Sequence, residues 1–390
     1  MTIMVLGALG ACGGIVMALS QRDVKRVLAY STVENTGLIT LGIGAALLAA
    51  AAGQPLVAAL AWSAVLLHVW NHAVAKGLLF FGAGAIAQLV GSRDLEHWGG
   101  LLRRLPLLGT TVMIGAAALV GLPGTHGFAS EWLMLLSFFR GSQSLAGPER
   151  LTMLLAVVTV AFTAGTALAC FVRIVGVGLL GHPRSAAAAT ARSPADAGLA
   201  IPVALLAGAC FGLVLLLGPM LGLLVHAVAQ LVPGAPLDQV RRLAAPLPWL
   251  AVLPLAAASL IMLYRAWLRR TRTIREAVTW DCGYARPESS MQYTASSLPQ
   301  PITRVLQPAL RSAVQWRAPE SLWPSAMSWE SRTPERALAE VYRPAFARIA
   351  GLLGFFQRLQ EGRVMVYLRY VGMALLVLLF WFFWPSEGPR

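Results

Sequence analysis

Charged residues are scarce in this chain, and lysine is the scarcest of the common cations. Only 12% of the 390 residues are charged and 57% are hydrophobic, whereas about one quarter of a soluble domain is charged. The mean hydropathy is +0.67, and apolar runs of about 20 residues, each able to cross a bilayer, recur along the chain. The short alternating segments of a membrane barrel do not occur. We therefore expect an all-α polytopic membrane protein.

Cysteine is also rare, and its spacing excludes several kinds of site. The four cysteines lie far apart and form no CxxC motif; they are Cys12, Cys170, Cys210 and Cys282. Three of them lie in apolar segments, where a free thiol behaves as a small hydrophobic side chain. The spacings of iron–sulfur, haem and zinc sites are missing, so no cofactor and no metal are expected. No basic leader with a cleavage site precedes the first apolar run, so we expect no signal peptide.

Acidic residues are outnumbered, which raises the question of a nucleic-acid partner. The chain has 17 acidic residues against 31 lysines and arginines, a net charge of +14. The arginines lie in short loops and near the ends of apolar runs, as topology determinants and lipid headgroup contacts do. Basic stretches interleaved with stacking aromatics are missing outside the membrane context. The expected surrounding is the lipid bilayer, and nucleic acid is excluded as a partner.

Eight or nine membrane spans are predicted from the apolar runs. Their approximate ranges are 3–20, 27–51, 56–90, 106–122, 126–140, 151–181, 198–231, 247–265 and 364–384. The third run, about 35 residues or roughly 50 Å as a helix, must tilt, bend or protrude. The short basic loop QRDVKR at 21–26 is expected inside, the neutral turn AAGQP at 51–55 outside, and the basic loop at 91–105 inside again.

Two irregular regions interrupt this pattern. Pro123 and Gly124 divide the apolar stretch between 106 and 140, and a short interrupted segment is the signature of a discontinuous helix near a transport site. The bundle is expected over 1–265, followed by a polar, turn-rich region at 266–333. An amphipathic surface helix at 334–362, kinked at Pro344, and an anchor at 364–384 complete the chain. The apolar stripe of the amphipathic helix comprises Leu338, Val341, Ile349, Leu352, Leu353, Phe356 and Leu359, with Arg336, Arg348 and Arg358 off it.

The two lysines of the chain are Lys25 and Lys76, and the second lies inside an apolar span. His68, His72 and Lys76 are spaced by four residues, so they share one helix face. A buried lysine can release a proton, whereas arginine stays protonated; histidine titrates near neutral pH. This stripe predicts a proton relay. Structural contacts between helices are the alternative, and a metal site is disfavoured because no acid or thiol lies nearby.

Two glutamates extend the candidate relay. Glu131 follows the Pro–Gly break, where an acid can meet freed backbone groups and water; alternatively, it is a first-turn acid favoured by the helix dipole. Glu34 is roughly 10 Å into the second span, and it is expected either to pair with Lys25, Arg26 or the histidine stripe or to be solvated at the interface. Asp23, Lys25 and His126 are possible accessory residues. The first two are interpreted chiefly as loop charges, and His126 as a helix cap together with Ser130.

Several separated motifs resemble one known family. The segments QRDVKRVLAYST, WNHAVAKGLLFFGAGAI and GLPGTHGFASEW are similar to the antiporter-like, proton-translocating subunits of respiratory complex I and Mrp antiporters. More narrowly, STVENTGLI, GFASEWLML and DCGYARPESSMQYTASSLPQPI resemble the branch that serves hydrogenase-4 and formate hydrogenlyase. The resemblance runs from Gly13 to about Ile302. Within it, Ser290 and Leu298 stand where that branch would have an arginine and a phenylalanine.

The resemblance implies two inverted five-helix repeats, each with a broken helix, joined by a central row of charged residues and water. By this resemblance Lys76 matches the central relay lysine, with His68 and His72 beside it. Glu131 matches the ionisable residue at the second broken helix, and Glu34 the acid of the hydrogenase-linked branch. The repeat that normally precedes the QRDVKR loop has no counterpart here, so the chain is expected to be the C-terminal part.

The resemblance also implies partners and a location. Family members work beside other membrane subunits and a peripheral hydrogenase or quinone-reducing arm, in the bacterial inner membrane. A separate chain could supply the missing repeat. The leading hypothesis is a proton-translocating subunit of such an assembly, with no catalytic centre of its own. The alternatives are a structural docking subunit without flux and a component of a sodium/proton antiporter; an independent enzyme is disfavoured, since no nucleophile or cofactor motif is visible.

Overall fold

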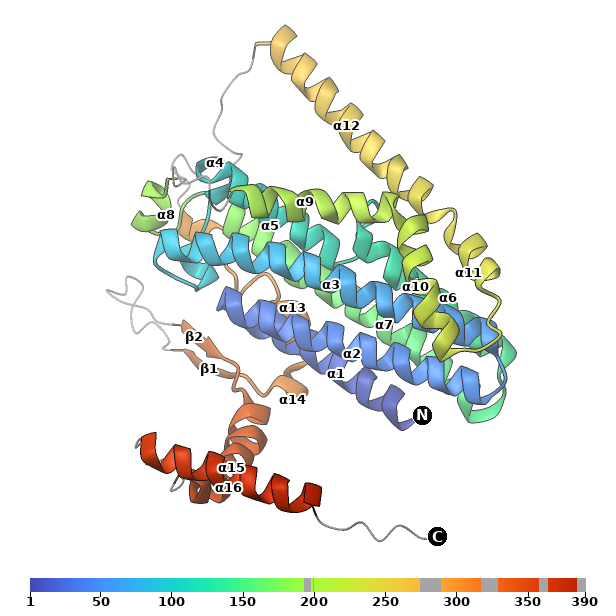
Figure 1. Cartoon of the computed structure of the whole chain (residues 1–390). Coiled ribbons are helices and arrows are strands. Elements are labelled where there is room, and N and C mark those ends of the chain that lie inside the picture. The colour runs from blue at the N-terminus through green and yellow to red at the C-terminus, as the bar shows by residue number, and fades with distance from the viewer. Residues whose placement is uncertain (193–197, 199, 274–288, 317–328, 358–363, 384–390) are drawn as a thin grey trace. The chain divides into compact units, whose positions relative to one another are not determined.

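The computed structural model describes residues 1–192, 198, 200–273, 289–316, 329–357 and 364–383 (Figure 1). These residues divide into two compact units, 1–333 and 334–390. The first is a helical bundle with a small layer of short elements at one end. The second, where it is described, consists of short helices.

The bundle begins with two helices in very close contact, α1 (Thr2–Ser20) and α2 (Val24–Ala51). Glycines make the approach possible. A Cβ on Gly14 would collide with the backbone of Glu34, and one on Gly37 would collide with the backbone of Ala11. Small residues at such crossings are typical of membrane helix pairs. The packing fixes the part of α2 that carries Glu34.

Helix α3 (Pro55–Val90) is continuous over 36 residues, roughly 54 Å. Pro55 suits the first helical position, and Gly91 ends the helix with a φ of 70°. It packs against α2 on one side and against α5 and α9 on the other, with α6 and α10 further along (Figure 1). Residues on α3 can therefore contact most of the bundle.

The predicted interruption at Pro123 and Gly124 separates α5 (Pro106–Leu119) from α6 (His126–Ser144). Gly121 and Gly124 adopt φ values of 64° and 105°, which favour glycine. A Cβ on Gly127 would collide with the carbonyl oxygen of Ala118, so the end of α5 and the start of α6 lie in contact. The discontinuity expected from the sequence is present.

A second interruption was not expected. The range 198–231 was predicted as one span, but α9 (Ala200–Leu215) and α10 (Leu217–Leu231) meet at an angle of 79°. Gly218 and Pro219 follow the bend, and a proline in the first turn of α10 is incompatible with a continuous helix through Leu216. The bundle also contains α7 (Gly147–Arg173), which continues as the π-helical segment η2 (Ile174–Leu179), then α11 (Leu237–Ala244) and α12 (Leu247–Thr271).

Among the described residues, every predicted span corresponds to a helix, except 198–231, which corresponds to the bent pair α9–α10. Six helices are long and apolar enough to cross a membrane, or seven if the bent pair α9–α10 counts as one span. Helix α5, with 14 residues, is shorter, and α6 is the more polar half of the broken pair. An all-α polytopic membrane protein, the predicted class, is confirmed.

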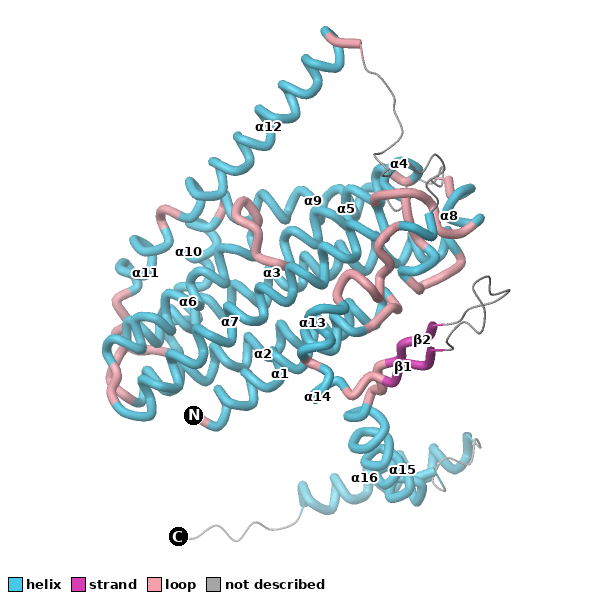
Figure 2. Tube along the Cα trace, turned by 180° about the vertical axis from the view of Figure 1, so that it is seen from behind, coloured by secondary structure: helices cyan, strands magenta, loops and turns pink. Residues whose placement is uncertain are grey.

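One end of the bundle carries short elements from three parts of the chain. They are η1 (Leu95–His97), α4 (Leu101–Arg104), α8 (Ala186–Thr190), η3 (Ser289–Met291), α13 (Gln300–Val305) and α14 (Gln307–Leu310). Strands β1 (Ala313–Trp316) and β2 (Trp329–Arg332) form an antiparallel pair beside them (Figure 2). Asp23 and Asp94 form a β-bridge, so the two basic loops predicted on one side of the membrane lie at the same end.

The polar region predicted at 266–333 is only partly described. Residues 274–288, which include Cys282 and the first half of the DCGYARPESS motif, and 317–328 lie outside the described residues. Leu298, one of the two departures from the family pattern, packs against the core of the bundle. The side chain of Ser290, the other departure, is outside the described part.

The second unit contains the π-helical segment η4 (Ala337–Tyr342), α15 (Arg343–Gln357) and α16 (Val364–Phe383). Pro344 is the second residue of α15, directly after the π-helical segment, so the helix geometry changes at the predicted kink. Leu338, Val341, Ile349, Leu352 and Leu353 are exposed. Arg358 and Leu359 lie outside the described residues, as does the side chain of Phe356. Among the residues described in this unit, none covers the apolar stripe or α16.

Candidate functional site

The three titratable residues predicted from spacing lie on the continuous helix α3. Lys76 and His68 are buried, with exposed fractions of 6% and 2%, and His72 is partly buried. Successive members are one helical turn apart, about 6 Å along the axis. The apolar span thus carries a buried polar stripe, as the sequence predicted.

Lys76 is held by neutral groups of α2. Its Nζ donates to the carbonyl oxygen of Leu28 at 2.8 Å and to the hydroxyl of Ser31. Ser31 in turn donates to Leu28 O at 3.1 Å. Because these partners are a carbonyl and a hydroxyl, loss of a proton from Lys76 would leave no anion paired with it.

His68 bridges α2 and α6. Its Nε2 lies 3.1 Å from Asn35 Oδ1, and its Nδ1 lies 3.0 Å from Ser130 Oγ. The amide of Asn35 donates from Nδ2 to Ser31 O at 2.8 Å and to Glu34 Oε2 at 3.4 Å. The Asn35 oxygen must therefore accept, and Nε2 of His68 must carry a proton.

Ser130 lets His68 take either protonation state. Its hydroxyl lies 3.0 Å from Gly127 O and 3.0 Å from His68 Nδ1, and it has one proton to donate. When His68 is neutral, the hydroxyl donates to Nδ1. When His68 is protonated, Nδ1 donates to Ser130, and the hydroxyl turns to Gly127 O. Both arrangements use the same heavy-atom positions.

Asn71 completes the connection between α3 and the broken helix. Its Nδ2 donates to His126 O at 2.7 Å and to Ser130 Oγ at 3.0 Å. Both acceptors belong to the first turns of α6, directly after the break. The stripe on α3 is thereby bonded to the helix that carries Glu131.

The two glutamates line a common narrow gap between α2, α5, α6 and α7 that is too small for a water molecule. Glu34 is buried at 3% exposure, and Glu34 and Glu131 line the gap together with Thr163 of α7. The carboxyl of Glu131 packs on Gly121, where a Cβ would collide with it. A glycine in the break thus makes room for the acid. Of the partners considered for Glu34, the structure links it to the histidine stripe, through Asn35.

Several buried polar atoms beside this network have no hydrogen-bond partner within the described part of the chain. They are Asn71 Oδ1 and both ring nitrogens of His72 and of His126. Buried polar atoms normally bond to a protein group or to ordered water. Free hydrogen-bonding capacity therefore adjoins the stripe at His72 and at the start of α6.

The possible accessory residues Asp23, Lys25 and His126 lie outside the buried stripe on α3. Asp23 caps α2 by accepting from the backbone nitrogens of Lys25 and Arg26, and Lys25 is exposed. They lie at the end of the bundle and not in the buried stripe, in agreement with their interpretation as loop charges. The expected caps of α6 are wrong: Thr125 takes the N-cap position without a side-chain bond, His126 is the first helical residue, and Ser130 bonds α3.

The neutral residues that join the titratable ones, Ser31, Asn35 and Asn71, were not predicted from the sequence, and neither was the bridging role of Ser130. A signal existed, since Ser31, Glu34 and Asn35 recur at helical spacing in an apolar span. Among the described residues, no group of three His, Cys, Asp or Glu side chains is placed to hold a metal ion.

Comparison with known proteins shows which families the chain resembles. Residues 1–163 match the family "NADH:quinone oxidoreductase/Mrp antiporter, TM". The chain is 33% identical to hydrogenase-4 component B of Escherichia coli over 97% of its length and 58% of that protein. It is also 33% identical to formate hydrogenlyase subunit 3 of the same organism, over 83% of this chain and 52% of that one.

The N-terminal 163 residues are thus similar to the membrane part of this family. The resemblance predicted from the motifs is therefore confirmed, including its hydrogenase-4 branch. The chain spans less than two thirds of the length of these relatives, 58% and 52%.

A solved structure has a similar fold. The structure of a membrane-bound sulfane sulfur reductase, an archaeal respiratory membrane complex, contains a chain that superposes with a TM-score of 0.60. The match covers 97% of this chain and 55% of that one at 19% identity. At this identity the likeness concerns the fold alone.

Proposed function

We propose that this antiporter-like chain moves protons through the membrane along the buried residues of α2, α3 and α6. The observation that carries the proposal is the stripe of Lys76, His72 and His68 on one unbroken helix, bonded at His68 to both flanking helices. Glu34 adjoins it on α2, and Glu131 lies at the helix break. Titratable residues inside a bundle are costly and mark ion or proton paths.

The contacts suit proton transfer in steps. Lys76 binds neutral acceptors, and His68 keeps its bonds in both protonation states because the Ser130 hydroxyl can turn. His72 stands between them with both ring nitrogens available among the described residues. Gaps of about one helical turn can be crossed by side-chain motion or by bridging water.

We further propose that the chain works within an assembly whose other subunits carry the redox centres. The relatives are named as a component of a hydrogenase and a subunit of a lyase. Helix α12 buries only Leu247 and Ala251 in its own unit, and α16 buries none of its residues. Apolar helices this exposed fit contacts with lipid and with other membrane subunits.

The decisive experiment replaces each of the chain's two lysines by alanine in the intact complex. Lys76→Ala should abolish redox-driven acidification or alkalisation of proteoliposomes, while electron transfer remains measurable. Lys25→Ala, at the exposed start of α2, should leave both unchanged. Proton movement that survives in Lys76→Ala at the wild-type rate would refute the relay; flux that depends on added sodium would favour the antiporter alternative.

A docking role without flux is the second candidate, favoured by the uncovered helices of residues 334–390. Deletion of these residues should then dissociate the complex in a pull-down, and Lys76→Ala should not affect coupled proton movement in the full-length chain. If the complex stays intact without residues 334–390, docking through this unit is excluded.

A further inference from the structure

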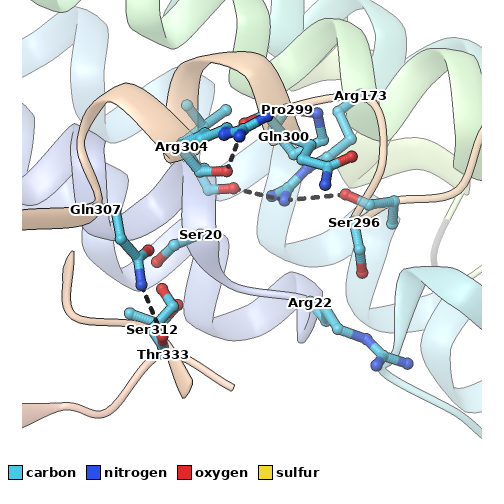
Figure 3. A pocket seen from close by; sticks show the side chains of 13 residues that line it. Ser20, Arg22, Arg173, Ser296, Pro299, Gln300, Arg304, Gln307, Ser312 and Thr333 are labelled. Carbon is cyan, nitrogen blue, oxygen red and sulfur yellow. Dashed lines mark hydrogen bonds between the residues drawn. The ribbon is translucent and has the colours of Figure 1, made fainter. Parts of the chain in front are cut away.

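A cavity of about 240 Å³ opens at the end of the bundle that carries the basic loops (Figure 3). The C-terminal end of α1 and the last residue of α7 form one wall. The segment around α13 and α14 forms the other. The polar and charged lining residues are Ser20, Arg22, Arg173, Ser296, Gln300, Thr303, Arg304, Gln307, Ser312 and Thr333.

The lining of this cavity is strongly basic. It includes three arginines, and none of its described lining residues is acidic. One of the three, Arg22, is bound to Asp94 at 2.7 Å. Arg304 is exposed at the rim. The charge that lines the cavity is therefore not balanced by the lining itself.

Arg173 is the unusual member, because it is a buried cation with 1% exposure. Its Nη1 donates to Leu19 O at 2.6 Å and to Ala295 O at 3.4 Å, and its Nη2 donates to Ala18 O at 3.2 Å. Its Nε is buried with no partner in the described part of the chain. Carbonyls at the end of α1 carry only partial negative charge. A full negative charge next to this guanidinium would be stabilised.

We propose that this cavity binds a phosphate group, carried either by an anionic phospholipid headgroup or by a small soluble phosphate compound. Arginine forks match the geometry of phosphate oxygens, and amide and hydroxyl groups supply further donors. Basic pockets at the cytoplasmic ends of membrane helices take lipid headgroups in this way. The cavity adjoins the end of the span Thr2–Ser20 and Arg173, six residues before the end of the span Gly147–Leu179, close to the level at which headgroups are expected.

The test uses the full-length chain purified in detergent and native mass spectrometry with added phosphatidylglycerol. One tightly retained lipid is expected for the wild type, with phosphatidylcholine retained far less. Thr303→Glu places an acid in the lining, and Arg304→Gln removes a rim charge. Each should weaken retention by roughly fivefold or more, the size expected for one charge near a headgroup.

Arg311→Gln is the matched control, since Arg311 is exposed on the same segment but does not line the cavity. Its lipid retention should equal the wild type, and thermal unfolding should show that all three variants remain folded. Competition with inorganic phosphate separates the two sources. If millimolar phosphate does not displace phosphatidylglycerol from the wild type, the ligand of the cavity is the lipid. If phosphate displaces the lipid, and does so less effectively in both cavity variants, the ligand is a soluble phosphate compound.

Equal retention by the wild type, Thr303→Glu and Arg304→Gln, together with no variant-sensitive binding of inorganic phosphate, would overturn the proposal. The basic cavity would then bind another class of partner, such as an acidic segment of a neighbouring protein. The experiment involves no proton transfer, so its outcome is independent of the relay.

Discussion

In the middle of the bundle, Lys76 donates to a carbonyl and a hydroxyl of α2; at its end, Arg22 and Arg184 bind the carboxylates of Asp94 and Glu96 at 2.7 and 3.2 Å. The first region uses histidine and lysine and leaves ring nitrogens without partners among the described residues. The second uses arginine, paired with acids or backbone carbonyls. In the proposed relay, Lys76 forms no ion pair with a described residue, whereas the arginines that hold the loops together are bonded to carboxylates or carbonyls.

The comparison predicts that damage to the basic end unfolds the structure, whereas damage to the stripe mainly affects proton movement. The largest effect on stability should come from Arg173→Met. The change removes the donors to Ala18, Leu19 and Ala295, and of these three carbonyls only that of Ala18 keeps a second donor among the described residues, the backbone nitrogen of Gln21, so the free energy of unfolding should fall by about 3 kcal/mol. Thermal unfolding in detergent measures it.

Arg150→Met is the control for this prediction, because Arg150 lies exposed in the first turn of the same helix α7. It should change stability by no more than about 0.5 kcal/mol. Equal unfolding temperatures for the two variants would show that the contacts of Arg173 contribute nothing measurable to stability. The bonds at the basic end could then not be said to stabilise the fold.

Ser130→Ala tests the other half. It leaves His68 Nδ1 and Asn71 Nδ2 each short of a partner, at a cost of about 1–2 kcal/mol in stability. Proton movement in the intact complex should slow roughly tenfold, since a loss of about 1.4 kcal/mol in the transition state has that effect. The rate of proteoliposome acidification or alkalisation, measured against electron transfer, gives the ratio.

Ser137→Ala is the matched control on α6. Ser137 is equally buried, at 1% exposure, but within the described part of the chain its hydroxyl donates to the carbonyl of Met134 in its own helix and to no other helix. Its removal should leave the coupling ratio unchanged. If both serine variants lower coupling equally, the bond between Ser130 and His68 has no special part in it.

The sequence predicts those residues of the stripe and of the basic end whose type is rare in an apolar span. His68, His72, Lys76, Glu34 and Glu131 were identified because titratable residues are exceptional inside apolar spans. Their neutral connectors were missed because serine and asparagine are ordinary in helices, and only tertiary packing shows which neighbour they reach. The Asn35 bond to His68 joins residues 33 positions apart.

Arg173 was missed for the opposite reason. It lies inside the predicted span 151–181, but the long side chain of an arginine near the end of a span can extend to the interface, so sequence alone gives no ground to bury it. Its side chain is buried by the C-terminal end of α1 and by the segment at Ala295, which lies 122 residues further along the chain. The bend between α9 and α10 is a milder case, because the Gly218–Pro219 pair is a known breaker signal inside a uniformly apolar run.

Glu96 gives a pH-dependent test of the basic end. Burial alone would raise the pKa of its carboxyl, but hydrogen bonds from the side chain and backbone of Ser296 outweigh burial, and the pKa lies below its usual value. Ionised Glu96 therefore stabilises the docking of residues 289–312 above the pKa of an unfolded glutamate, about 4.3. This contribution is lost as the pH falls through the lowered folded value.

Hydrogen exchange at the amide of Ser296, followed from pH 6 downward, should show loss of protection only in acid. Glu96→Gln should show the weakened docking already at pH 6, because the amide lacks the charge that binds Ser296 and Arg184. Protection in Glu96→Gln that equals the wild type at every pH would mean that the carboxylate does not hold this segment.

The smallest effect should come from Asp23, whose charge is not its main contribution. Its carboxylate accepts from the backbone nitrogens of Lys25 at 2.8 Å and Arg26 at 3.2 Å, whereas its ion pair with Arg93 is long, at 3.8 Å, and partly exposed. Asp23→Ala should lower the free energy of unfolding by about 1 kcal/mol, the usual cost of a lost cap. Asp23→Asn keeps a capping oxygen and should cost only a few tenths, as exposed ion pairs do. Chemical denaturation in detergent measures both.

Neither variant should alter proton movement, since Asp23 and Lys25 lie at the basic end. A coupling defect in Asp23→Asn would place that end on the proton path and remove the division between the two regions.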